Sequence, residues 1–429
     1  MGLRARIDRA QTTAELGVLA LHEWVESGLV FNPTRKALRA DPHPWYRMLR
    51  ERDPVHRSRL ADGWVLSRHR DILEVLRDPS WSSDERNWSR YARYRARGER
   101  AGLPDPYQED RASMLRLDPP DHTRLRGLVS KAFTLRAVEA MRPRIQALVD
   151  ELLTRVDGRE LALLGEFAAP LPVIVIAEML GVPRADHEWF RQMSDEAIKL
   201  LGDSSIEERL EGVRATHELT EYFRGIVEAR RAEPRDDLIS ALVGAEEAGV
   251  RLSESELLAT CILLLVAGNE TTTKLIGNAV VALCRNPEQR ELLRAEPKRI
   301  EGAVDELLRY DGPVQLTSRM AREDRELLGR RARKGQQIVL LLAAGNRDPD
   351  AFPDPDRLDV TRENVRHLAF SHGLHYCLGA QLARLEAGLA LEGLIARCPR
   401  FRLAEQRIEW SPNTVLRGPL EVRLALERA

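Results

Sequence analysis

Apolar residues recur at helical spacing over most of the chain. Two clear stripes have apolar side chains three or four positions apart: Ile145, Leu148, Leu152 and Val156, and then Leu378, Leu382, Leu385 and Leu389. Such spacing places the side chains on one helical face. Residues 253–285 are apolar on most faces and predict a long buried helix, with a capping box of Ser253 and Glu256 at its start and Asn286-Pro287 at its end.

Strand patterns are shorter and fewer. The stretch VHRSRLADGWVLS predicts two strands around the turn Ala61-Asp62-Gly63, and residues 337–343, QIVLLLA, predict a buried strand after Gly335. The stretch FPDPDRLD, residues 352–359, predicts a loop because proline fixes φ and removes a donor. We therefore expect a mainly α protein with small β-sheets, with residues 1–30 as a helical extension and residues 31–429 as one main domain.

Charge and hydropathy exclude several classes of protein. There are 66 Lys+Arg and 67 Asp+Glu, so the net charge of −1 gives no global field for nucleic acid or an anionic membrane. The longest uncharged apolar run, residues 257–269, has thirteen residues, whereas a membrane span needs roughly 20. The N-terminus does not resemble a signal peptide. We expect a cytoplasmic monomer.

Four cysteines are present, Cys261, Cys284, Cys377 and Cys398, and none forms a CxxC pair. This spacing argues against a disulfide framework or a structural zinc site. Cys377 differs from the others because it lies between Gly373 and Gly379 in FSHGLHYCLGAQLAR, where Leu378-Gly379-Ala380 opens a helix. Helix-start amides stabilise a thiolate, and the two glycines favour a bulky flat ligand above the sulfur. A buried structural cysteine would not explain His375 or these glycines.

The centre of the long helix contains small and polar residues, from Ala267 and Gly268 through Asn269 to Glu270, Thr271 and Thr272. Glycine costs roughly 1 kcal/mol relative to alanine in a helix interior, and a buried carboxylate costs more unless it has a partner. These residues alone leave two interpretations open, a polar kink filled by water or a functional site.

Phe370, Gly373, His375, Cys377 and Gly379 match the F-x-x-G-x-H/R-x-C-x-G haem-binding signature. From about residue 31 to its end the sequence resembles the cytochrome P450 family. The resemblance implies the cytochrome P450 fold, a haem b cofactor, and Cys377 as the axial thiolate that pushes electron density onto iron to favour O–O cleavage.

Further motifs extend the resemblance. Glu306-Leu307-Leu308-Arg309 is similar to the family's E-x-x-R, with Arg357 in the place of its third member. Within DPPDHTRLR, His122 and Arg126 are four positions apart and share a helical face. The resemblance implies that these two residues, together with Arg319 and His375, contact the haem propionates.

The same resemblance gives the helix centre a purpose. Ala267 and Gly268 would leave room for dioxygen, Thr271 would hydrogen-bond the oxygen being activated, and Glu270 would relay protons. The implied reaction is hydroxylation of a C–H bond in a hydrophobic small molecule, such as a macrolide, terpenoid, steroid or fatty acid. The implied pocket residues are Leu263, Val266, Gln315, Leu316 and Val415. Alternatives are a peroxide-using relative and a non-catalytic haem-thiolate sensor, which the Glu270-Thr271 pair disfavours.

The expected electron donor is a separate ferredoxin or flavodoxin with its NAD(P)H reductase, because no flavin or iron–sulfur domain is recognisable in the sequence. The family presents Arg124, Arg126 and Lys131 to such a donor. Residues 86–100 interleave arginine with aromatic residues, as in single-stranded nucleic-acid binding, but the family uses this region as a loop over the substrate. The sequence departs from the family at Ser371, where glycine is common, and before Gly335, where proline is usual.

Overall fold

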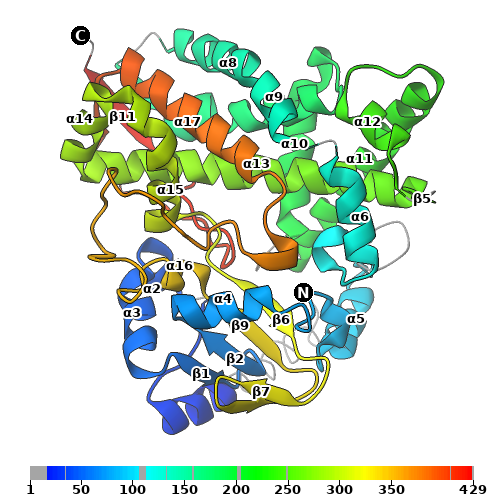
Figure 1. The fold of residues 1–429 in the computed structure, drawn as a ribbon, viewed down its shortest axis with the longest axis vertical. Coiled ribbons are helices and arrows are strands. Elements are labelled where there is room, and N and C mark those ends of the chain that lie inside the picture. Colours follow the sequence, from blue (N-terminus) through cyan, green and yellow to red (C-terminus); the bar gives the residue numbers. More distant parts are fainter. Residues whose placement is uncertain are drawn as a thin grey trace.

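The predicted long helix is α13 (Glu254–Arg285), which crosses the helical part of the protein in a computed structural model (Figure 1). It begins with the predicted capping box: Glu256 N donates to Ser253 Oγ at 3.2 Å, and Ser253 N donates to Glu256 Oε2 at 2.9 Å. These two bonds satisfy amides that a helix start leaves without partners. The structure describes residues 17–33, 35–105, 113–131, 133–156, 159–200, 204–247, 250–405 and 407–427.

Helices form most of the described chain, as predicted. Besides α13, the α-helices are α2 (Lys36–Ala40), α3 (His43–Arg52), α4 (His69–Arg77), α5 (Tyr91–Arg100), α6 (Asp121–Ser130), α7 (Leu135–Ala140), α8 (Arg142–Thr154), α9 (Pro170–Met179), α10 (His187–Ala197), α11 (Ile206–Ala232), α12 (Leu238–Gly244), α14 (Pro287–Ala295), α15 (Ile300–Asp311), α16 (Leu342–Gly345) and α17 (Ala380–Arg397). Shorter 3-10 turns are η1 (Glu85–Asn87), η3 (Met114–Arg116), η5 (Arg184–Asp186), η6 (Ile198–Leu200), η7 (Pro297–Arg299) and η8 (Gly373–His375), and η4 (Leu163–Ala168) is a π turn.

The β structure is small and lies mostly at one end of the molecule (Figure 1). A four-stranded sheet has the order β1 (Val55–Ser58), β2 (Gly63–Leu66), β9 (Gln337–Leu340), β6 (Thr317–Met320), and only its β2–β9 pair is parallel. A three-stranded antiparallel sheet has the order β10 (Arg400–Leu403), β11 (Arg423–Glu427), β3 (Glu160–Ala162). The pairs β4 (Glu246–Glu247) with β5 (Val250–Arg251) and β7 (Arg325–Leu327) with β8 (Arg330–Ala332) are antiparallel hairpins.

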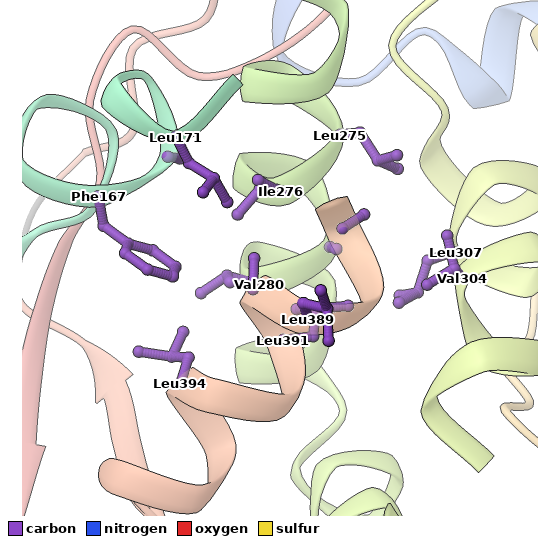
Figure 2. Packing of buried hydrophobic residues seen from close by; sticks show 14 of the residues in the cluster. Phe167, Leu171, Leu275, Ile276, Val280, Val304, Leu307, Leu389, Leu391 and Leu394 are labelled. Atoms are coloured by element: carbon purple, nitrogen blue, oxygen red, sulfur yellow. The ribbon is translucent and has the colours of Figure 1, made fainter. Parts of the chain in front are cut away.

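The main core forms where α13 meets α9, α15 and α17 (Figure 2). In Figure 2, Val280 of α13 lies between Phe167 and the α17 leucines Leu389 and Leu391, and Leu394 lies on the same side as Phe167. Burying these side chains stabilises the fold by about 25 cal/mol per Å² of apolar area. This packing fixes α13 against the helix that follows Cys377.

Three predicted boundaries are wrong by a few residues. The strand predicted for residues 337–343 ends at Leu340, because the chain then turns into the short helix α16. Val156 follows the end of α8, and Leu378 precedes the start of α17, although the other members of both stripes are buried on their helices. The hairpin around Ala61-Asp62-Gly63 and the loop at residues 352–359 are confirmed.

The described part of the N-terminal extension is helical over residues 17–27 and is anchored by a buried carboxylate. Glu23 is fully buried and accepts hydrogen bonds from Ser58 Oγ at 3.1 Å and from the amides of Arg59 and Leu60 at 2.6 and 3.1 Å. This segment is therefore attached to the end of β1. Residues 1–16 of the predicted extension lie outside the described residues. Over the described range, no helix is both long and apolar enough to span a membrane.

Candidate functional site

Cys377 lies in a tight loop just before α17. Its amide donates to the Phe370 carbonyl at 2.9 Å, and Gly379 is the N-cap of the helix that begins at Ala380. Burial raises the pKa of the Cys377 thiol, while the Gly379 amide and the Arg126 guanidinium act to lower it. The helix start predicted to stabilise a thiolate is therefore present, but burial outweighs it. A bound metal cation would supply the charge compensation that is still missing.

The two glycines around Cys377 have different roles. Gly373 has φ +68°, and a Cβ there would overlap the Leu76 carbonyl oxygen, so this glycine serves the turn and the close approach of α4. The prediction that Gly373 makes room for a ligand is therefore wrong. A Cβ on Gly379 would meet nothing within 4 Å, and the same is true of Gly268 on α13. Open space thus begins at both of these positions.

Four cationic side chains predicted for one site lie together. The ring centroids of His122 on α6 and His375 in η8 are 4.1 Å apart, and the charges of Arg319 on β6 and Arg126 on α6 both act on His375. Burial, followed by Arg319 and His122, lowers the pKa of His375 to about 3. Burial lowers the pKa of Arg319 to about 10, and it also lowers the pKa values of His122 and Arg126. Each cationic form is therefore destabilised in this arrangement.

Among the described residues, no carboxylate forms an ion pair with the four side chains of this cluster. Arg319 is 6% exposed and donates to the Ser318 carbonyl at 2.8 Å, and within the described ranges no carboxylate pairs with it. His122 Nδ1 is buried without a hydrogen-bond partner there. The nearest acid, Asp118, is held by Arg322 at 2.5 Å and by the Ser83 amide at 2.8 Å. A ligand with two carboxylates would satisfy these cations, and haem has that chemistry.

The centre of α13 borders free space, although most of this helix is buried. Ala267 is exposed although many neighbouring residues on the helix are buried, and Gly268 faces free space. Thr271 Oγ1 donates to the Ala267 carbonyl at 2.5 Å, so its oxygen remains able to accept a hydrogen bond. Glu270 Oε1 lies 2.7 Å from Lys274 Nζ. The sequence interpretation missed Lys274, although a Glu followed by a Lys four positions later is a known signal for a helical ion pair.

The E-x-x-R pair forms a buried network, but its third member differs from the prediction. Glu306 and Arg309 are fully buried, with Arg309 Nε 2.6 Å from Glu306 Oε2. The second guanidinium on Glu306 belongs to Arg362, at 3.3 Å. Arg357 contributes its carbonyl, which accepts from Arg309 Nη2 at 3.1 Å, while its side chain is exposed. The turn at residues 352–359 directs backbone carbonyls inward, so the role predicted for the Arg357 guanidinium is wrong.

The predicted pocket residues are only partly accounted for. Gln315 is buried, and its amide group is engaged by Tyr46 Oη at 3.1 Å and by the Gly312 carbonyl at 2.9 Å. Its backbone amide donates to the Val415 carbonyl at 2.8 Å, so these two predicted residues are neighbours. Leu316 packs against the apolar cluster of the N-terminal helices, and Leu263 and Val266 of α13 are half-buried at the edge of a second cluster.

Comparisons with known proteins agree with this geometry. The profile of the family described as Cytochrome P450 matches residues 188–424. The chain is 42% identical to Cytochrome P450 107B1 of Saccharopolyspora erythraea, covering 89% of this chain and 94% of that protein. It is 41% identical to the Vitamin D(3) 25-hydroxylase of Pseudonocardia autotrophica, covering 88% and 92%. The solved structure of the Bacillus subtilis cytochrome P450 PksS superposes with a TM-score of 0.85 at 35% identity, covering 93% and 100%. The chain therefore belongs to the cytochrome P450 family and is a haem-binding cytochrome P450 monooxygenase.

Proposed function

We propose that this enzyme uses haem b to insert one atom of O₂ into a C–H bond of a hydrophobic small molecule. The observation that carries the proposal is the sequence of features along α13: an exposed Ala267, a Gly268 that faces free space, and then Glu270 and Thr271. When bound, the haem would supply the oxygen-activating chemistry. Cys377 would be its thiolate ligand, and Arg319, His122, Arg126 and His375 would hold its carboxylates.

The chain's own part in the reaction is proton delivery. Thr271 Oγ1 gives its hydrogen to the Ala267 carbonyl and so presents a lone pair toward the open side of the helix. Glu270 is one residue earlier, half-buried, and can take up and release a proton. This acid and alcohol pair favours turnover that consumes NAD(P)H over turnover that begins from peroxide.

The relatives support a hydrophobic substrate without naming it. One of them is named as a vitamin D(3) hydroxylase, and the half-buried aliphatic residues Leu263 and Val266 lie on α13 just before Ala267. We propose a macrolide, terpenoid, steroid or fatty acid. Titration of such a library into the ferric enzyme, followed by the shift of the Soret band, selects among these classes.

The proposed electron donor is a separate ferredoxin or flavodoxin that docks at α6. Of the three cations expected there, Lys131 is exposed at the end of the helix, whereas Arg126 is half-buried and acts on Cys377. Arg124 forms an ion pair with Glu256 at the start of α13. Replacing Lys131 by Glu should therefore slow reduction at low salt without changing haem content, and an unchanged rate would exclude Lys131 from the docking surface.

The thiolate assignment is tested by the carbon monoxide difference spectrum of the dithionite-reduced protein. We expect a strongly red-shifted Soret band for the wild type and for Cys284→Ala, and loss of that band for Cys377→Ser. Cys284 is a half-buried thiol elsewhere in the core, so it controls for the loss of a sulfur atom. A red-shifted band that survives in Cys377→Ser would exclude this residue as the ligand.

The proton-delivery role is tested by comparing turnover supported by NAD(P)H with turnover supported by peroxide. Glu270→Gln combined with Thr271→Ala should reduce NAD(P)H-coupled product formation by about a hundredfold and leave peroxide-driven turnover nearly unchanged. Thr260→Ala is the matched control, because Thr260 on the same helix also donates to the carbonyl four residues earlier, at 2.7 Å. An equal fall in both activities would show that these residues do not deliver protons.

A further inference from the structure

Lys274 is a buried lysine at the centre of α13, one turn after Glu270. Its Nζ lies 2.7 Å from Glu270 Oε1, and the side chains of the two residues are 6% and 21% exposed. Lysine is almost never buried unless its charge is paired. Exposed helical pairs of this kind contribute little to stability, but removing one partner of a buried pair leaves an uncompensated charge. The position of this pair in the core therefore sets it apart from the surface ion pairs.

The segment at residues 417–419 closes this face of the helix. A Cβ at Gly418 would lie only 2.5 Å from Lys274 Cγ and 2.9 Å from its Cδ, so the lysine stem fills the space that this glycine leaves. One turn further along α13, Asn278 Nδ2 donates to the Arg417 carbonyl at 3.2 Å. The lysine stem is thus confined between α13 and this segment, and its ammonium group is directed along the helix to Glu270.

The two carboxylate oxygens of Glu270 have different surroundings. Oε1 is occupied by Lys274, whereas Oε2 is buried and has no hydrogen-bond partner among the described residues. A buried acceptor without a partner is rare and unfavourable, which points to a proton or a water molecule at this atom during function.

A second acidic side chain, Asp195 of α10, interacts with Glu270. Burial raises the pKa of Asp195, and the negative charge of Glu270 adds to this rise. Arg191 pairs with Asp195 at 3.0 Å, and Asn269 Nδ2 donates to Ser194 Oγ at 2.9 Å. Glu270 therefore has an acidic neighbour on α10 and its cation, Lys274, on its own helix. Without the lysine, Glu270 would lose its cation and keep this acidic neighbour, which is itself paired with Arg191.

We propose that Lys274 is a positioning residue for proton delivery, which holds Glu270 as a carboxylate through Oε1 and leaves Oε2 as the atom that carries each proton. This inference rests on the proposed role of Glu270. For each proton delivered, Oε2 takes up one proton from the solvent side and releases it toward Thr271 Oγ1, and each turnover uses two such protons because one atom of O₂ leaves as water. The carboxylate then returns to its ion pair with Lys274, so neither residue undergoes a net change.

The test uses Lys274→Met, which removes the charge at similar length, and Lys274→Gln, which retains a polar tip in case the methionine variant fails to fold. Both are made in the haem-loaded enzyme, with and without Glu270→Gln. Difference infrared spectra at neutral pH, taken against the matching protein that carries Glu270→Gln, should show ionised carboxylate bands for the wild type. Each Lys274 variant should instead show a protonated carboxyl band, because a buried carboxylate without its cation takes up a proton.

The functional readout is the fraction of NAD(P)H electrons recovered in product. Both Lys274 variants should lower this fraction by about tenfold, with haem content and peroxide-driven turnover unchanged. Lys199→Met is the control, since Lys199 forms a partly exposed pair with Glu196 at 2.6 Å outside α13. If Glu270→Gln leaves the fraction unchanged, the proposed role of Glu270 fails. If Glu270→Gln lowers it but the Lys274 variants neither lower it nor produce the carboxyl band, the inference about Lys274 is wrong and the role of Glu270 stands.

Discussion

The imidazole rings of His122 and His375 lie 4.1 Å apart, with a 44° angle between their planes. They come from α6 and from the loop before Cys377, and burial together with neighbouring positive charge lowers the pKa of both rings. Arg319 and Arg126 lie close enough to act on the pKa of His375, so the two rings and two guanidinium groups form one basic cluster. The proposed haem, with its two carboxylates, would account for this arrangement of the four side chains.

Arg319→Leu should stabilise the haem-free protein but weaken its retention of haem. The guanidinium is buried and has no acidic partner in the described part of the chain, so its removal should raise the free energy of unfolding of the haem-free protein by about 1–3 kcal/mol. The same change should accelerate haem loss about tenfold, because a carboxylate loses its cation. Chemical denaturation of the apoprotein and transfer of haem to apomyoglobin measure the two effects. Arg331→Leu, at an exposed position, is the control for both, and unchanged haem loss in Arg319→Leu would contradict the assignment.

Replacing Arg362 by leucine should reduce stability much more than replacing Arg357 by leucine. Arg362 pairs with the fully buried Glu306 and donates to the Pro353 carbonyl at 2.7 Å, so Arg362→Leu should cost about 1.5–3 kcal/mol. Arg357 contributes only its backbone carbonyl to this network, so Arg357→Leu should change stability by less than about 0.5 kcal/mol. Urea denaturation of the haem-loaded variants checks the difference. Equal losses would mean that the Arg357 side chain also supports Glu306.

Ser371→Gly should stabilise the loop under the predicted haem site. Ser371 has φ +60°, and its buried Oγ has no partner among the described residues. A non-glycine residue in this region costs roughly 1–2 kcal/mol, and the greater freedom of glycine in the unfolded chain offsets part of that gain. We therefore expect Ser371→Gly to raise the free energy of unfolding by about 1 kcal/mol. Asn364→Gly is the control, because asparagine tolerates its φ of +53° and should gain less. A loss of stability in Ser371→Gly would show that the hydroxyl has a role.

The sequence predicted features that depend on local pattern and on residue type. The capping box of α13, the hairpin at Asp62 and the loop at residues 352–359 follow from neighbouring residues alone, and the structure confirms them. The identity of the second arginine on Glu306 could not be predicted in this way. It depends on which groups of a folded loop face inward, and that is fixed by tertiary packing rather than by spacing.

In the candidate site, too, features that depend on local sequence could be predicted, whereas features that depend on tertiary packing could not. The resemblance located Cys377 and the four cations, because these residues lie in recognisable motifs. Lys274 lies outside them, and the role that we propose for it depends on knowing its burial, its distance to Glu270 and the closeness of Gly418 together. Gly373 shows the opposite error, since a motif glycine with an expected ligand role proves to be required by its φ and by the carbonyl of Leu76.

Glu386 should make stability fall as the pH rises. This carboxyl is buried on α17, its Oε2 has no partner in the described chain, and burial raises its pKa to about 8. Between its ordinary pKa of 4.5 and about 8 the folded protein keeps a proton that the unfolded chain releases, so the free energy of unfolding declines with pH across this window.

Glu386→Gln cannot release that proton. Its free energy of unfolding should equal that of the wild type near pH 4.5. Toward pH 8 it should exceed the wild-type value by an amount that grows by up to about 1.4 kcal/mol per pH unit. Denaturation curves at several pH values provide the measurement, and Glu392→Gln, at an exposed position on the same helix, should follow the wild type at every pH. Parallel curves for Glu386→Gln and the wild type would mean that Glu386 is ionised in the folded protein and that a partner compensates its charge.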